Sequence, residues 1–154
     1  MSALTIRNGE WIVVCDGKKA LVLQNDGDAQ LLNFKTVKVI EQKDMATHEL
    51  GTDRPGRAQA VGSGPRSSVG QTDWHDQAEH TFLTHLAEFL DRSLAAGQTK
   101  SLVMVAPPRA LGMLRPAYSN ALRGAIRAEI DKDLVKMPVH EIERHLSARS
   151  ERPE

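Results

Sequence analysis

The apolar residues in the first quarter of the chain fall into short, nearly continuous runs. Residues 10–16 form a β-branched run that ends at an Asp-Gly pair, and residues 19–25 form a second run after a tight turn. A run that is apolar at successive positions is typical of a strand covered on both faces. A third apolar segment covers residues 31–41. The sequence therefore predicts three consecutive strands in an antiparallel meander.

The rest of the chain predicts alternating helices and strands. Apolar residues at 3.6-residue spacing predict a long helix that begins at Thr72 or Asp73 and ends near Ala96, with a core-facing stripe that starts at Trp74 and Ala78. A strand follows over residues 101–106, and then one or two helices over residues 109–124. Residues 126–131 predict a fifth strand, with a helix as the alternative, and a last helix begins at Pro138. Residues 147–154 are polar and predict a frayed tail. The order β-β-β-α-β-α-β-α predicts an α/β fold with a mixed five-stranded sheet and helices on both faces.

Length and composition exclude several classes of protein. The 154 residues match a single domain over 1–154, and the formal net charge is zero, which argues against binding through bulk positive charge. The single cysteine, Cys15, excludes a disulfide framework and a multi-cysteine zinc site. The first ten residues lack a signal-peptide pattern, and the apolar runs are too short to span a membrane. We therefore expect a cytoplasmic protein with no membrane partner.

Residues 46–72 have a different composition, with seven glycines or prolines and much Ser and Thr. A segment of this kind predicts a long flexible loop, and such loops are usually functional or disordered. Its cations are Arg54, Arg57 and Arg66, against the single acid Asp53 between residues 51 and 72. Guanidinium groups match phosphate oxygens and glycines let backbone amides approach them, so the loop is a candidate anion-binding segment. A solvated loop with local ion pairs is the alternative.

Two further candidate sites lie where predicted strands end. Arg109 follows a Pro-Pro pair at the sheet edge where open α/β folds bind ligands, although a plain surface arginine is an equal alternative. The carboxylates Asp16, Asp73 and Asp131 are weak candidates for a Mg²⁺ or Mn²⁺ site. Turns, helix caps and solvated charge runs explain the same acids, so we expect no metal. The sequence has no glycine-rich nucleotide motif and no nucleophile elbow, so no cofactor is expected.

Three motifs carry a family resemblance when they are taken together, and they cover residues 49–57, 102–112 and 128–134. With residues 11–14 and 72–79, they resemble the bacterial family called "protein required for attachment to host cells", over about 9–146. The family name records a phenotype in plant-associated bacteria and not a molecular activity. The family in turn looks like a distant relative of the middle domain of eukaryotic and archaeal class-one peptide-chain release factors and of Pelota. That resemblance implies a ribonuclease H-like fold.

The resemblance also draws attention to the end of the predicted loop. In release factors, the loop between the third strand and the first long helix carries a Gly-Gly-Gln tripeptide that enters the peptidyl transferase centre. This chain has Gly70-Gln71, but Val69 stands where the first glycine would be. Valine restricts the backbone freedom that glycine would give, which argues against peptidyl-tRNA hydrolysis. Gln71 is therefore a weak candidate for a catalytic residue.

These inferences favour a non-enzymatic adaptor that contacts RNA, tRNA or the ribosome through the loop, with Arg109 and Arg115 on the adjacent edge. The first alternative is a hydrolase, acting on peptidyl-tRNA or an ester through the loop, or as a metal-dependent nuclease through the carboxylates. The second alternative is a protein–protein interaction module that affects attachment indirectly.

Overall fold

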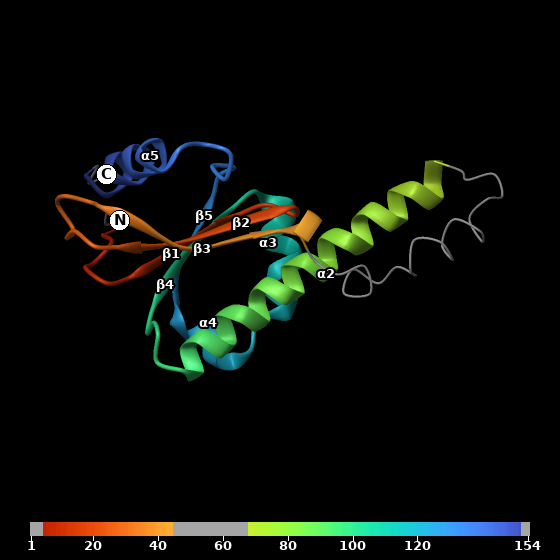
Figure 1. Ribbon diagram of the computed structural model, residues 1–154, viewed down its shortest axis with the longest axis horizontal. Helices are drawn as coiled ribbons and strands as arrows, with labels where there is room; N and C mark the ends of the chain where they lie inside the picture. Colours follow the sequence, from red (N-terminus) through yellow and green to blue (C-terminus); the bar gives the residue numbers. More distant parts are fainter. Residues whose placement is uncertain (1–4, 45–67, 152–154) are drawn as a thin grey trace.

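The computed structural model describes residues 5–44 and 68–151 (Figure 1). Its strands are β1 (Trp11–Cys15), β2 (Lys19–Asn25), β3 (Phe34–Glu41), β4 (Leu102–Ala106) and β5 (Ile126–Asp131). Its helices are the 3-10 turn η1 (Gln42–Asp44), α2 (Ser68–Ala95), α3 (Pro108–Leu114), the 3-10 turn η3 (Arg115–Ala117), α4 (Asn120–Ala125) and α5 (Val139–Glu151).

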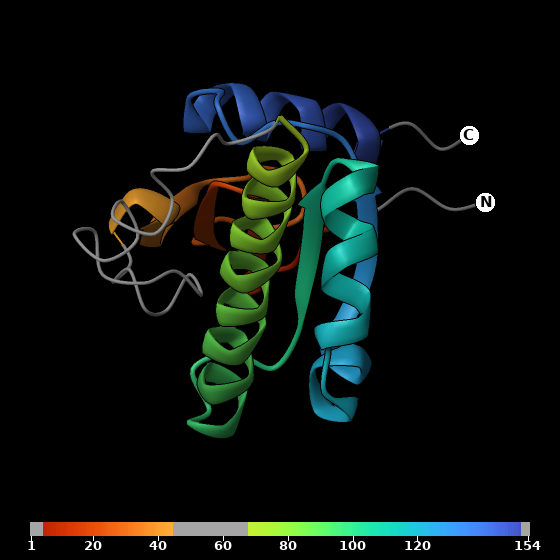
Figure 2. The same cartoon turned by 90° about the vertical axis from the view of Figure 1, so that its right-hand side faces the viewer.

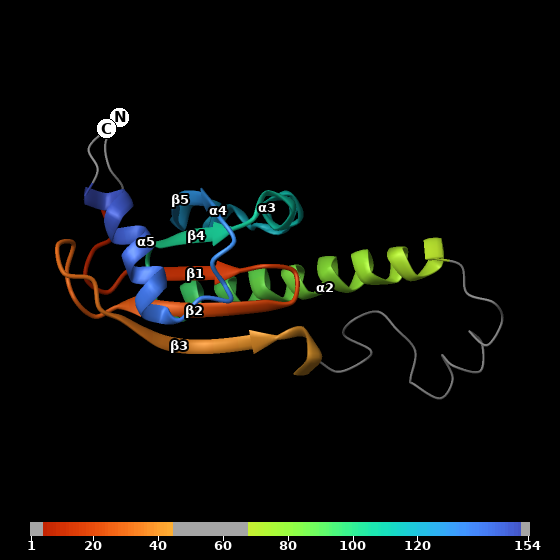
Figure 3. The ribbon, with the colours of Figure 1, turned by 90° about the horizontal axis from the view of Figure 1, so that it is seen from above.

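The five strands form one mixed sheet in the order β3-β2-β1-β4-β5. The pairs β1–β2 and β2–β3 are antiparallel, whereas β1–β4 and β4–β5 are parallel, so the carboxyl ends of β1, β4 and β5 share one edge (Figure 3). This arrangement confirms the predicted meander and the mixed five-stranded α/β sheet. It is consistent with the ribonuclease H-like fold that the resemblance implies.

The sheet separates two apolar cores. Helices α2, α3 and α4 cover one face, and Figure 2 shows α2 beside α3 and α4, with α5 on the other side of the sheet. Successive residues of a strand point to opposite faces, so Trp11 and Val13 enter the first core while Ile12 enters the second. Because both faces of β1 and β4 are covered, every residue of these two strands is buried. This burial explains the continuous apolar runs in the sequence.

The predicted start of the long helix is wrong, because α2 is longer at its amino-terminal end than the sequence indicated. Helix α2 begins at Ser68, before the predicted Thr72 or Asp73, and α5 runs to Glu151 through most of the predicted frayed tail. Extending an existing helix adds one hydrogen bond per residue, so a helix continues until a strong breaker stops it. The nearest prolines are Pro65 before α2 and Pro153 after α5. That residues 1–154 form a single domain stays a prediction.

The amino-terminal part of α2 projects beyond the carboxyl edge of β1 and β4 (Figures 1 and 3). The apolar spacing predicted Trp74 as a core residue, but its side chain is 42% exposed, whereas Ala78 one turn later is buried. The prediction for Trp74 is wrong because the periodic stripe continues past the end of the sheet that it packs against. At the other end of α2, Gly97 has a φ of +77°, and the helix ends there as predicted.

Candidate functional site

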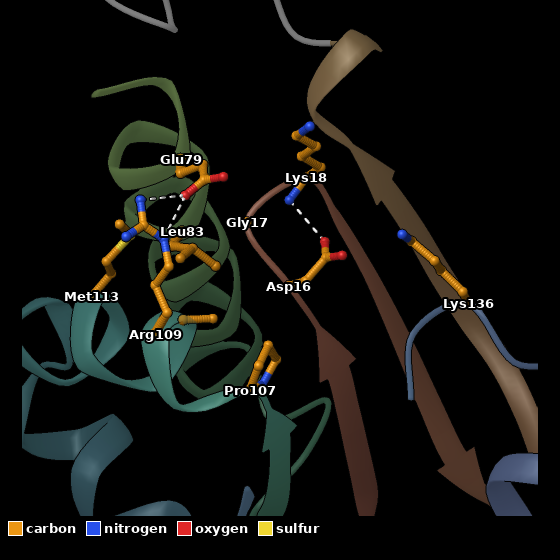
Figure 4. Close-up of a pocket in the computed structure, with 10 residues that line it drawn as sticks. Asp16, Gly17, Lys18, Glu79, Leu83, Pro107, Arg109, Met113 and Lys136 are labelled. Atoms are coloured by element: carbon orange, nitrogen blue, oxygen red, sulfur yellow. Dashed lines mark hydrogen bonds and ion pairs between the residues drawn. The ribbon is translucent and has the colours of Figure 1, made fainter. Parts of the chain in front are cut away.

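A pocket of about 270 Å³ lies at the carboxyl ends of β1 and β4, beneath the projecting part of α2 (Figure 4). Open α/β sheets bind ligands at this kind of edge. The pocket is lined by the β1–β2 turn, one face of α2, the start of α3 and one residue between β5 and α5. The lining residues are Asp16, Gly17, Lys18, Glu79, Leu83, Pro107, Arg109, Ala110, Met113 and Lys136.

Arg109 lies in the pocket wall and is held by two carboxylates of α2. Its Nε and Nη2 atoms donate to Oε1 of Glu79 at 3.3 and 3.2 Å, and Nη2 also donates to Asp76 (Figure 4 shows the Glu79 contacts). The hydrogen bonds that Arg109 donates to Asp76 and then to Glu79 raise its pKa above the ordinary value. The guanidinium therefore fastens the start of α3 to α2. Its predicted role as an anion ligand stays a prediction.

Asp16 shapes the turn on the opposite side of the pocket. Its Oδ1 atom accepts the backbone N–H groups of Lys18 at 2.8 Å and Lys19 at 2.9 Å, which is an Asx-type turn. The turn packs closely on α2, because a Cβ atom at Gly17 would lie 2.8 Å from the Glu79 side chain. Turn formation therefore accounts for Asp16, in agreement with the alternative to a metal ligand.

Two lysines at the pocket were not singled out by the sequence. The ammonium groups of Lys18 and Lys136 have no ion-pair partner within residues 5–44 and 68–151, and both residues are exposed. Lys18 precedes β2, and Lys136 follows the buried pair Leu134 and Val135. Their local sequence gives no sign of this position. The two residues are far apart along the chain, and only the folded sheet brings them to the same pocket.

Of the other predicted anion ligands, the structure describes Arg115, which does not line this pocket. Arg54, Arg57 and Arg66 lie outside the described residues. Arg115 lies in a second pocket, where its Nε and Nη2 atoms donate to Oε1 of Glu129 at 3.0 and 2.7 Å. Arg109 and Arg115, both expected on the edge adjacent to the loop, line different pockets, and their role as anion ligands stays a prediction.

The catalytic and metal candidates receive no support from the described residues. The backbone of Gln71 and Asp73 lies in α2 and not in a loop, while their side chains lie outside the described residues. Asp131 ends β5 and is exposed. In the part of the chain that the structure describes, no three His, Cys, Asp or Glu side chains gather as a metal site would require. Burial raises the pKa of the Cys15 thiol, with a smaller effect from Asp16, so Cys15 is a poor nucleophile.

Sequence reasoning also missed a buried charge cluster at the opposite edge of the sheet. Glu10 accepts hydrogen bonds from Arg127, from the Ser101 hydroxyl at 2.9 Å and from the Arg7 backbone at 3.1 Å. These groups join the starts of β1, β4 and β5, so the cluster stabilises the fold and lies away from the pocket. A charged residue directly before an apolar strand was the only signal in the sequence.

Comparison with known proteins identifies a family for this chain. No described helix is long and apolar enough to cross a membrane. None of the curated proteins matches the chain. The family model described as "Protein required for attachment to host cells" matches residues 11–146, which include all five strands and most of α5. The chain therefore belongs to the family of proteins required for attachment to host cells.

Proposed function

We propose that this protein contacts RNA, as tRNA or within the ribosome, through residues 45–67 and the carboxyl edge of β1. Arg54, Arg57 and Arg66 of that segment would bind phosphate groups, because guanidinium forks match phosphate oxygens. Lys18 and Lys136 would add positive charge at the adjoining pocket. The protein would act as an adaptor and would not transform the RNA.

The observation that carries this proposal is the position of the two elements that flank residues 45–67. The turn η1 packs on the β1–β2 turn, where the Gln42 backbone N–H donates to Lys18 O at 2.8 Å and the Gln42 side chain donates to Gly17 O at 3.0 Å. Helix α2 begins beyond the same edge of the sheet (Figure 3). The elements on either side of the arginine-bearing segment therefore lie at or beyond the edge that holds Lys18.

Two lysines of the pocket that make no ion pair among the described residues also support contact with a polyanion. Arg109 faces two carboxylates, Asp76 and Glu79, so these three groups together carry a net negative charge and add no attraction for a polyanion. The lysines carry no such partner within the described ranges. A flexible ammonium group suits non-specific phosphate contact, since it needs no fixed hydrogen-bond geometry.

The family resemblance guides the choice of probe. We infer from it that the chain is a distant relative of the release-factor middle domain, and that the relation extends to the ribosome as a partner. The backbone of Gly70 and Gln71 lies in the first turn of α2, and this does not favour a hydrolytic version of this proposal. For these reasons tRNA and ribosomes are the probes, and binding rather than turnover is the readout.

The test is fluorescence anisotropy of labelled tRNA and co-sedimentation with ribosomes, each over a series of salt concentrations. The wild-type protein is expected to bind at low salt, with an affinity that falls steeply as salt rises. In the double variant Arg54→Gln/Arg57→Gln, the slope of log K against log salt should fall by roughly 0.7–0.9 for each phosphate that the variant no longer neutralises. Lys18→Gln/Lys136→Gln should give a smaller change in the same direction.

A matched control removes two exposed cations elsewhere. Arg92 in the last turn of α2 and Lys100 after it are exposed, and Arg92→Gln/Lys100→Gln changes the net charge by the same amount. This control should leave the salt slope unchanged. Absence of binding at low salt, or an equal decrease in affinity in the control and the loop variant, would reject the proposal. A protein partner recovered without RNA would instead favour the interaction module.

A further inference from the structure

A second pocket, of about 350 Å³, lies between η3–α4 and the amino-terminal half of β5. Three of its seven lining residues are arginines, and we call it the arginine pocket. Its lining residues are Arg115, Tyr118, Arg123, Ile126, Arg127, Ala128 and Glu129. Ligand pockets of a few hundred cubic ångströms hold small molecules, so this pocket is large enough for a compact ligand.

Each of the three guanidinium groups is held by the protein along one edge. Arg115 donates to Glu129, and Arg127 donates to Glu10 with N–O distances of 2.5 and 2.8 Å. Arg123 lies 5.8 Å from the centroid of the Tyr118 ring, and its Nη2 atom makes long contacts to two backbone carbonyls, at 3.4 and 3.5 Å. The side chains are therefore oriented before any ligand arrives.

The opposite edges of these groups remain available. None of the three Nη1 atoms donates to an acceptor within the described ranges of the chain. The Glu129 carboxylate is already used, because its Oε1 atom accepts from Arg115 and its Oε2 atom accepts from the Tyr118 hydroxyl at 3.1 Å. The pocket thus offers guanidinium N–H donors. Among its described lining residues, no carboxylate oxygen is free to accept a hydrogen bond.

The arginine pocket carries a net positive charge, because one of its three arginines has no carboxylate partner among the described residues. Glu129 neutralises Arg115, and Glu10 neutralises Arg127, whereas Arg123 has no carboxylate partner among the described residues. Asp131 acts on Arg115 only weakly and from a distance. Arg123 is therefore the residue that would attract an anion.

We propose that the arginine pocket binds the phosphate group of a small phosphomonoester, with Arg123 as the principal ligand. A phosphate offers three or more oxygens, and it matches a pocket whose lining includes three guanidinium groups. A metal cation is disfavoured there, since the donors are N–H groups and both carboxylate oxygens are occupied. The site is separate from the proposed RNA-binding edge, because the two pockets share no residue.

Tyr118 provides a selective probe, since it is the only tyrosine in the chain and lies under Arg123. Protein labelled with ¹³C in the tyrosine ring gives one set of ring signals by NMR. Titration with adenosine monophosphate should shift these signals in a saturable way, whereas sodium chloride at equal ionic strength should not. A parallel titration with inorganic phosphate shows which kind of molecule supplies the phosphate group. If inorganic phosphate binds more weakly than adenosine monophosphate, the site is assigned to a phosphomonoester. If the two bind equally, the site recognises the phosphate group alone.

Three variants complete the test. Arg123→Gln should weaken binding about tenfold or more, the effect of removing a charged hydrogen-bond donor. Arg123→Lys should fall between Arg123→Gln and wild type, since it keeps the charge but loses the fork. Arg92→Gln is the control of equal charge change, and it should bind as wild type does.

The proposal is overturned if no saturable shift occurs at millimolar ligand, or if Arg123→Gln binds as tightly as the control. Arg123 is exposed, so its replacement should leave the melting temperature near that of wild type. Binding of tRNA by Arg123→Gln should also be unchanged. The test of the arginine pocket is therefore independent of the test of the RNA-binding edge.

Discussion

Replacing Arg127 by methionine tests whether the buried charge cluster stabilises the fold. The variant would leave the Glu10 side chain, which is 2% exposed, without the cation that contacts both of its oxygens. The Ser101 hydroxyl and the Arg7 backbone N–H would remain as its hydrogen-bond donors. A buried carboxylate would thus keep two weak donors and lose its counter-charge.

The expected loss of stability follows from the burial of the Glu10 carboxylate. Removing one partner of a buried ion pair destabilises a protein by about 3–5 kcal/mol. Arg127 is 27% exposed and two donors to Glu10 persist, so we expect about 2–4 kcal/mol. For a chain of this size, a loss of about 3 kcal/mol lowers the melting temperature by roughly 6–12 °C.

The effect should depend on pH with a defined sign. Burial by itself would raise the pKa of Glu10, but hydrogen bonds from Arg127, the Arg7 backbone and Ser101 together hold that pKa below its ordinary value of 4.5. A lowered pKa in the folded state stabilises the protein above pH 4.5, and this contribution is lost as the pH falls through the folded-state pKa. Without Arg127, burial should raise the pKa of Glu10, so protonation in acid would relieve the penalty.

Urea denaturation of wild type and Arg127→Met near neutral pH and below pH 4.5 measures both effects. The difference in the free energy of unfolding should be large near neutrality and should shrink in acid. Glu10→Gln and the double variant complete a double-mutant cycle, whose coupling energy should be about 1 kcal/mol or more. A loss below about 1 kcal/mol for Arg127→Met, or a loss that is the same at both pH values, would refute this account.

Three further predictions concern the turn at the pocket, a helix cap and the buried thiol. Gly17→Ala should destabilise the protein by about 1–2 kcal/mol in urea denaturation, because the new Cβ would displace the Glu79 side chain. Gly112→Ala is the control, and it should be neutral or slightly stabilising because the new Cβ would lie in open space. Ser119→Ala should cost about 1–2 kcal/mol, because the Ser119 hydroxyl caps α4 and also bonds a carboxylate of α2; an equal stability of Ser119→Ala and wild type would contradict this. Cys15 should react with a thiol reagent only in denaturant, and rapid labelling of the native protein would show that the thiol is accessible.

Much of the fold could be predicted because the strands of the sheet are covered on both faces. The runs at β1 and β4 are apolar at every position, since each residue enters one of the two cores. Strand order followed from chain order, because a meander and right-handed crossovers leave few arrangements. The helix boundaries were less predictable: local signals marked Asp73 as a start, but continued backbone hydrogen bonding set the start at Ser68.

The pocket could be located from the sequence, but its chemistry could not. The Pro-Pro pair before Arg109 marked the end of β4, and the rule for open α/β sheets placed a site there. The partners of Arg109 lie 30 and 33 positions earlier, on α2. Glu10 and Arg127 are 117 positions apart. Pairs this distant depend on strand order and helix packing together, and no local pattern encodes them.

A neutral sequence can still bind a polyanion where its cations are unpaired. In the described part of the chain, Arg109, Arg115 and Arg127 each face a carboxylate of another element, so these arginines hold the fold together. Lys18 and Arg123 have no such partner there, and they lie at different pockets. Because the paired arginines attract ligands only weakly, replacing them should lower stability first. Replacing Lys18 or Arg123 should lower binding first, and this contrast separates structural from ligand-binding cations by experiment.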